Sequence, residues 1–203
     1  MRGAMSAKRG RLEGWPIVGW SALVLVAMAG MLLGVYGTQE EGVRVLIRAT
    51  ARTSFVLLLA AFVASSARRL WRNDATSWLL RNRRYLGVSF AASHALHLAG
   101  ILTLVTRWPD SFWSKTSKAT IFGGGLGYLF VAAMTLSSSD AAVRRLGMRR
   151  WKLLHRAGIW VLFGIFVLTY GPAGLSHPAY LPASFACIGA LGLRIAARIR
   201  ARA

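Results

Sequence analysis

The 203-residue chain has little acid and almost no cysteine: six Asp and Glu stand against 26 Lys and Arg, and Cys187 is its only cysteine. A single cysteine excludes an intrachain disulfide and any metal site built from several thiolates. No nucleophile and base are accompanied by an acidic residue that would orient them, so hydrolytic chemistry is not expected. Cys187 lies inside an apolar run, where we expect it to be packed and buried.

Apolar residues are abundant. They make up 55% of the chain, the mean hydropathy is +0.47, and only 16% of residues are charged. A soluble domain of this size needs more polar surface to cover its core. The apolar runs alternate with short basic segments, and each run approaches the roughly 20 residues that a membrane-spanning helix needs. We therefore expect one all-α membrane domain over residues 1–203, a bundle of six transmembrane helices at about 15–36, 46–67, 85–107, 119–138, 153–171 and 178–197.

The net charge of +20 is concentrated at the ends of the apolar runs. This placement favours the lipid bilayer, with its anionic headgroups, over nucleic acid as the partner of the basic residues. The basic clusters fall in the N-terminal tail, in residues 68–84, in residues 144–152 and at the C-terminal end. Six crossings place all four clusters on one side, which predicts that both termini are cytoplasmic.

Three histidines lie inside predicted spans, where an ionisable residue is costly unless it has a function. His94 and His97 lie in the third span and, at i and i+3, share one helix face, whereas His155 lies near the start of the fifth span. Histidine is a common axial ligand of haem iron, and two facing helices of a bundle can supply a pair. The alternative is that these side chains only form hydrogen bonds with neighbouring helices.

Two strings carry a family resemblance: Arg83-Arg84-Tyr85-Leu86-Gly87, ten residues before His97, and Arg149-Arg150-Trp151-Lys152-Leu153-Leu154-His155-Arg156. Over roughly residues 45–170 the chain resembles the ferric reductase-like transmembrane family, and within it the haem-binding membrane subunits of periplasmic methionine sulfoxide reductase systems. The resemblance implies six helices in a bacterial inner membrane, b-type haem on histidines of the third and fifth spans, and electron transfer across the bilayer. Larger relatives carry a flavin and nicotinamide domain, so flavin or quinone is expected here through a separate redox partner protein.

The chain also departs from that family. Leu168 stands where the fifth helix usually offers a second histidine, and Arg83 and Arg84 occupy the region where larger relatives place an inner histidine. One haem b is therefore expected, bound by His155 together with His97 or His94.

The rise per residue of an α-helix does not decide which histidine of the third span pairs with His155. At 1.5 Å per residue, His94 and His97 lie roughly 15 and 20 Å from Arg84, whereas His155 lies about 8 Å from Arg150. This arithmetic favours His94 as the partner of His155, whereas the resemblance favours His97. A third possibility pairs His97 with His177 of an outer loop, although an exposed loop histidine is the simpler interpretation.

Arginines in the second span are further candidates. Arg44, Arg48 and Arg52 recur every four residues and so form one helical stripe. Arg48 and Arg52 lie near the outer boundary of the span, where they either extend to lipid headgroups or bind haem propionates or a quinone headgroup.

These observations predict a haem-binding electron-transfer subunit that passes electrons from a cytoplasmic flavoprotein or quinone to a periplasmic acceptor. The alternative is a haem-free membrane scaffold or assembly protein with the same helical frame. A family likeness does not decide whether ferric iron is itself a substrate of such an oxidoreductase subunit.

Overall fold

The computed structural model describes residues 12–202, and all regular structure within them is helical. The elements are α1 Trp15–Tyr36, α2 Glu40–Leu70, α3 Asp74–Arg81, α4 Arg83–Arg107, α5 Pro109–Lys115, α6 Lys118–Leu136, α7 Asp140–Leu146, α8 Met148–Ser176, the 3-10 turn η1 Pro178–Tyr180 and α9 Leu181–Ile199. The N-terminal tail cations used to predict orientation, Arg2, Lys8, Arg9 and Arg11, lie outside the described residues.

Six of these helices are long and apolar enough to cross a membrane, which confirms the expected multi-span bundle. The bounds of α1 agree with the prediction, whereas α2 and α8 extend beyond their apolar runs to 31 and 29 residues. The added N-terminal turns of both helices are rich in charged residues, and α2 is stabilised by Glu40 and Glu41 in its first turn, since carboxylates favour the positive end of a helix.

Three short helices, α3, α5 and α7, join the spans and were not predicted. They are too short and too polar to appear in a search for long apolar runs. Local capping stabilises α3 and α7: the Asn73 side chain accepts from the Thr76 amide at the start of α3, and the Ser139 side chain accepts from the Ala142 amide at the start of α7. Helix α5 has no side-chain cap and begins at Pro109, a residue suited to the first position of a helix.

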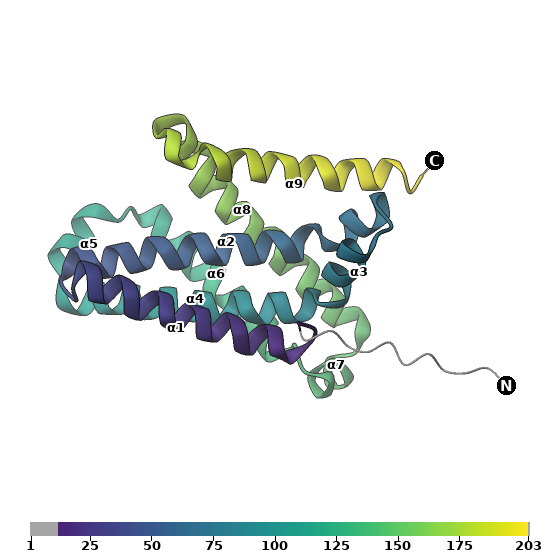
Figure 1. Ribbon diagram of the computed structural model, residues 1–203, viewed down its shortest axis with the longest axis horizontal. Helices are drawn as coiled ribbons and strands as arrows, with labels where there is room; N and C mark the ends of the chain where they lie inside the picture. The colour runs from purple at the N-terminus through teal and green to yellow at the C-terminus, as the bar shows by residue number, and fades with distance from the viewer. Residues whose placement is uncertain (1–11, 203) are drawn as a thin grey trace.

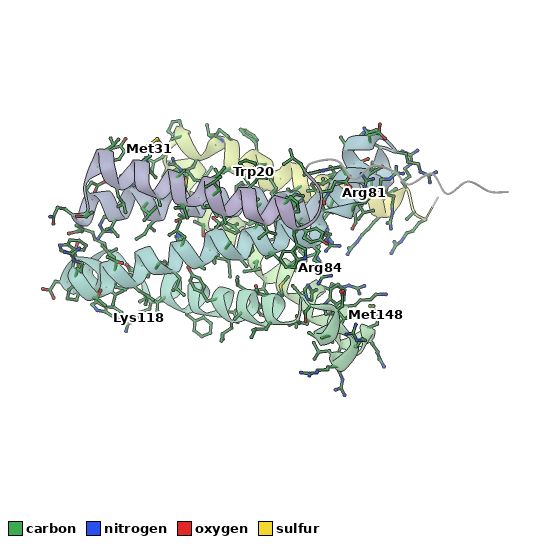
Figure 2. All side chains as sticks on the ribbon, turned by 60° about the horizontal axis from the view of Figure 1, so that its bottom comes forward. Trp20, Met31, Arg81, Arg84, Lys118 and Met148 are labelled. Carbon is green, nitrogen blue, oxygen red and sulfur yellow. The ribbon has the colours of Figure 1, made fainter. Side chains whose placement is uncertain are left out.

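Helix α2 is the centre of the bundle and has α4 as its most extensive partner. Figure 1 shows α1, α2 and α4 side by side, α8 crossing them obliquely, and α9 on the face opposite α1. The start of α1, the end of α9, and helices α3 and α7 gather at one end, which we call the basic end. Figure 2 shows Arg81, Arg84 and Met148 at this end, and Met31 and Lys118 at the opposite end.

An aromatic core joins α2, α8 and α9, with Phe62 and Phe163 stacked at 4.1 Å between ring centroids. Cys187 of α9 is buried in this core, as its apolar surroundings predicted.

The interface between α2 and α4 is instead a seam of small polar residues. Thr50, Ser54, Ser89 and Ser93 are all fully buried there. The Ser54 hydroxyl donates to Ser93 Oγ at 2.9 Å, and the Ser93 hydroxyl donates to the Thr50 carbonyl at 3.2 Å. Small hydroxyl residues let two membrane helices approach closely, and these two bonds satisfy Ser54 and Ser93, whereas Ser89 Oγ has no hydrogen-bond partner among the described residues. The seam therefore fixes how α4, with its histidines, lies against α2.

Candidate functional site

A cavity of about 990 Å³ opens among α2, α4, α6, α8 and α9 at the basic end. Within the described chain, α4 and α8 are not among the closely packed helix pairs, so space remains between them. Gly87 of α4 lines this space, and a Cβ added to it would meet no atom within 4 Å. Leu58, Phe90 and Leu162 form the apolar part of the wall, deeper in the bundle.

The rim of the cavity is strongly positive. Eight basic side chains and one carboxylate line it: Arg69, Arg81, Arg83, Arg84, Lys152, Arg156, Arg194, Arg198 and Asp140. Arg84 Nη1 contacts Asp140 Oδ1 at 2.8 Å, which neutralises one of these cations. The excess of guanidinium groups above an apolar wall suits an amphipathic ligand with carboxylates at one edge.

Arg194 is the most firmly held of these cations. Its guanidinium carbon lies 4.1 Å from the centroid of the Phe62 ring and 4.7 Å from that of the Trp160 ring. Its Nη1 also donates to the Phe62 carbonyl at 3.0 Å. Aromatic faces and a backbone oxygen thus hold a cation of α9 beside the cavity.

His155 lies in the wall of the cavity on α8. Its Nε2 lies 3.0 Å from Ser137 Oγ, and its ring centroid lies 4.3 Å from that of Trp151. Trp151 Nε1 in turn donates to the Ser137 carbonyl at 2.9 Å. One ring nitrogen of His155 is therefore held by α6, and the other has no hydrogen-bond partner within residues 12–202.

His97 is held differently, against α2. Its Nδ1 lies 3.0 Å from the Ile47 carbonyl oxygen and 3.2 Å from Thr50 Oγ1. A carbonyl oxygen only accepts hydrogen bonds, so Nδ1 carries the proton and the lone pair of the neutral ring is on Nε2. Histidines that bind metals commonly donate their second ring N–H to a carbonyl in this way, which fixes the tautomer.

His94 packs in an aromatic layer. Its ring centroid lies 5.1 Å from that of Phe90, 4.8 Å from that of Tyr128 and 5.3 Å from that of His97. Its Nδ1 is buried and has no hydrogen-bond partner among the described residues. No hydrogen bond to Nδ1 fixes the tautomer of His94, so the geometry favours His97 over His94 as an iron ligand.

The histidines of α4 and α8 lie at different levels of the bundle. The His94 ring lies 6.4 Å from the Phe166 ring, so these two residues share a level. Both helices run away from the basic end (Figure 1). Arg83 lies eleven residues before His94, and His155 lies eleven residues before Phe166; both line the same cavity. His155 thus lies about 16 Å along α8 from the level of His94, at 1.5 Å per residue. The structure does not bring His155 and the α4 histidines together around one iron atom.

The remaining predicted site residues lie away from the cavity. Arg48 is exposed and contacts Glu41 at 2.6 Å. Arg52 is exposed, with its guanidinium 5.7 Å from the Tyr180 ring. His177 is exposed where α8 ends, as the simpler sequence interpretation held, and its ring lies 6.5 Å from that of Tyr180.

Comparison with known proteins bears directly on this arrangement. The model of the family "ferric reductase like transmembrane component" matches residues 48–166, more than half of the chain and from α2 into α8. The chain belongs to this family. The match confirms the resemblance expected from the two sequence strings.

Several relatives of this ferric reductase-like chain carry the name protein-methionine-sulfoxide reductase heme-binding subunit MsrQ. That of Azospira oryzae is 34% identical over 140 residues, 61% of this chain and 54% of the relative. That of Rhodospirillum rubrum is 31% identical over 150 residues, 71% and 67% of the two chains, and that of Ralstonia nicotianae is 34% identical over 112 residues, 54% and 50%. The chain thus spans about half to two thirds of the length of these relatives. No solved structure matches it.

Sequence reasoning does not identify Arg83 and Arg194 as candidate site residues, yet both line the cavity. In the sequence, Arg83 is part of a family string and Arg194 belongs to the basic cluster at the C-terminal end. Arg194 lay inside the predicted span 178–197, and an arginine within a span is itself a functional signal.

Proposed function

We propose that this chain is a b-type haem-binding, transmembrane electron-transfer subunit of a bacterial inner membrane. The observation that carries the proposal is the cavity of about 990 Å³ whose wall holds His155 and whose rim is lined by arginines. Bound haem supplies a one-electron ferric/ferrous couple. The family of the chain and the names of its relatives support the same function.

The residues present fit such a group. His155 offers a ring nitrogen with no protein partner among the described residues, while Ser137 and Trp151 hold its ring. Arg83 and Arg194 are the proposed partners of the propionates, because guanidinium groups pair well with carboxylates at the edge of an apolar pocket. Gly87 leaves room for a flat macrocycle, since a side chain there would project into open space.

His97 is the proposed ligand at the second level, farther from the basic end. The hydrocarbon core of a bilayer is roughly 30 Å thick, so an electron crossing it needs intermediate positions. The level of His155 and the level of the α4 histidines lie about 16 Å apart along α8, so groups bound at these two levels would divide the crossing into shorter steps. We therefore propose one histidine ligand at each of two levels. The sequence alone predicts instead a single haem bound between two helices by one histidine from each.

The proposal places the electron donor and the electron acceptor on opposite faces of the membrane. We assign a cytoplasmic flavoprotein or the quinone pool as donor at the basic end, and a periplasmic protein as acceptor at the opposite end. Because the relatives are named as subunits of protein-methionine-sulfoxide reductase, the proposed acceptor is a catalytic subunit of that type.

Reduced-minus-oxidised visible spectra of detergent-purified protein, made with ample haem supply, test the proposal. The b-type bands are expected to weaken in His155→Ala and in His97→Ala, and to disappear in the double variant. His177→Ala, at an exposed position, is the matched control and should keep the full spectrum. A pyridine haemochrome assay counts the haem per chain.

The rival function is a haem-free scaffold. It is favoured by Arg83 at the level of His155 and by the exposed Leu168 near the level of His97, because neither residue completes a histidine pair. Wild-type protein without a Soret band would establish this rival and overturn the proposal.

A further inference from the structure

Among the described residues, Thr50 is the residue of α2 whose side chain forms a hydrogen bond with His97. Thr50 Oγ1 lies 3.2 Å from His97 Nδ1 and 2.8 Å from the Leu46 carbonyl oxygen. The carbonyl only accepts, so the single hydroxyl hydrogen of Thr50 is directed to the backbone and its lone pairs are left for another donor. The His97 Nδ1–H is that donor, shared between Thr50 Oγ1 and the Ile47 carbonyl as a three-centre bond.

The seam between α2 and α4 holds Thr50 in this position. Its carbonyl accepts from the Ser93 hydroxyl, which itself accepts from the Ser54 hydroxyl. Thr50, Ser54 and Ser93 are 0% exposed, so no solvent competes for these bonds. A hydrogen bond buried at low dielectric is electrostatically stronger than the same bond in water.

We propose that Thr50 is a positioning residue for His97. Together with the Ile47 carbonyl it holds the proton on Nδ1, sets the angle of the ring and leaves the Nε2 lone pair for iron. The inference rests on the proposed role of His97 as a ligand. By accepting from the far side of the ring, Thr50 makes the imidazole a stronger electron donor and so stabilises the ferric state.

The chain offers a well-matched control in Thr53, one helical turn farther along α2. Its hydroxyl donates to the Ala49 carbonyl at 3.0 Å, and its other polar neighbour is Met28 Sδ at 3.8 Å. Thr50→Val and Thr53→Val remove the same atom from the same helix, but only the first removes a contact with a histidine. Thr50→Ser restores the hydroxyl.

The first readout needs no haem. In haem-free protein labelled with ¹⁵N-histidine, the His97 signals are assigned by their loss in His97→Ala. The wild type, Thr50→Ser and Thr53→Val should show the Nδ1-protonated tautomer with a strongly hydrogen-bonded proton. In Thr50→Val that proton should shift upfield, because only the Ile47 carbonyl still accepts from it.

The second readout is the midpoint potential and haem affinity of loaded protein. Thr50→Val should raise the midpoint potential and weaken haem binding about tenfold, the lower end of the usual effect of losing such a partner. Thr50→Ser should restore both values. A merely structural role would lower the stability of Thr50→Val and leave the tautomer and the potential unchanged.

Identical ¹⁵N signals and potentials in Thr50→Val and Thr53→Val would overturn the inference. If Thr50→Val does not fold, Thr50→Ala replaces it in both measurements. Failure of the proposed function looks different: haem content would be unchanged in His97→Ala, while the ¹⁵N spectrum would still report on the bond between Thr50 and His97.

Discussion

Gly42 stands at a close approach between the turn after α1 and the first turn of α2. A Cβ at this position would collide with the carbonyl oxygen and carbon of Gly37, which are backbone atoms and cannot rotate away. Gly37 has a φ of +77°, in the region that only glycine adopts readily. Gly42→Ala should therefore lower the free energy of unfolding by about 1–3 kcal/mol, the usual cost of overpacking. Denaturant titration in detergent measures it.

Gly34→Ala is the control for this prediction. A Cβ at Gly34 meets no atom within 4 Å, and alanine is the better helix former, so stability should stay equal or rise. Equal stability of Gly42→Ala and the wild type would show that the turn after α1 is looser than described.

The sequence reveals some residues of the site, and the structure is needed to find the others. His97 and His155 could be found from the sequence because polar residues stand out in an apolar run. Their partners could not, because the Ile47 carbonyl is part of the backbone and carries no sequence signal. Thr50 and Ser137 are ordinary residues until the packing of α2 on α4 and of α6 on α8 brings them to a histidine.

Among the elements, α9 is held to α2 by arginines that reach backbone carbonyls. Arg194 donates to the Phe62 carbonyl at 3.0 Å, Arg69 to that of Ala197 at 3.3 Å, and Arg200 to that of Leu70 at 3.1 Å. The carbonyls of Leu70 and Ala197 lie in the last turns of α2 and α9, where C=O groups have no partner within the helix. The Phe62 carbonyl lies inside α2, so Arg194 uses its second lone pair.

Arg194→Met should loosen α9. The substitution keeps an unbranched apolar stem but removes the charge above Phe62 and Trp160 and the bond to the Phe62 carbonyl. Losing both should cost about 2 kcal/mol, given the usual worth of a partly buried cation–π contact and a charged hydrogen bond. Hydrogen exchange of residues 181–199 and denaturant unfolding in detergent would both report it.

Arg198→Met serves as the comparison, because the Arg198 side chain lines the cavity and makes no hydrogen bond or aromatic contact within residues 12–202. If the amides of α9 are equally protected from hydrogen exchange in Arg194→Met and Arg198→Met, the aromatic contacts of Arg194 do not contribute to the docking of α9.

Elements and their bounds were predictable to different degrees. The six spans follow from apolar length alone, since a bilayer demands it. The helices α3 and α7 depend on capping side chains, whereas α5 has none, and all three depend on packing at the ends of the bundle. Such features are local and polar, so a search for long apolar runs does not detect them.

For the whole molecule, the charge distribution makes a prediction about orientation. The basic end should face the cytoplasm and α5 the periplasm, because clusters of Arg and Lys stay on the cytoplasmic side. In a Cys187→Ala background, Ser114→Cys on α5 should react with a membrane-impermeant maleimide in spheroplasts. Ala201→Cys, beyond the end of α9, should react only after lysis.

Both probes occupy exposed positions, and the native Cys187 is buried, so labelling reports sidedness and not burial. Labelling of Ala201→Cys in sealed spheroplasts would contradict the predicted orientation. The donor and the acceptor would then be assigned to the opposite faces.

The cavity between α4 and α8 also sets an order of events during biosynthesis. Its walls come from the second to fifth membrane spans, and α9, in the sixth, adds Arg194 to its rim. The pocket is therefore not complete until α9 has been translated and inserted into the membrane. Any prosthetic group must be delivered after that point, and a ribosome that stalls before α8 leaves a product that no supply of that group can mature.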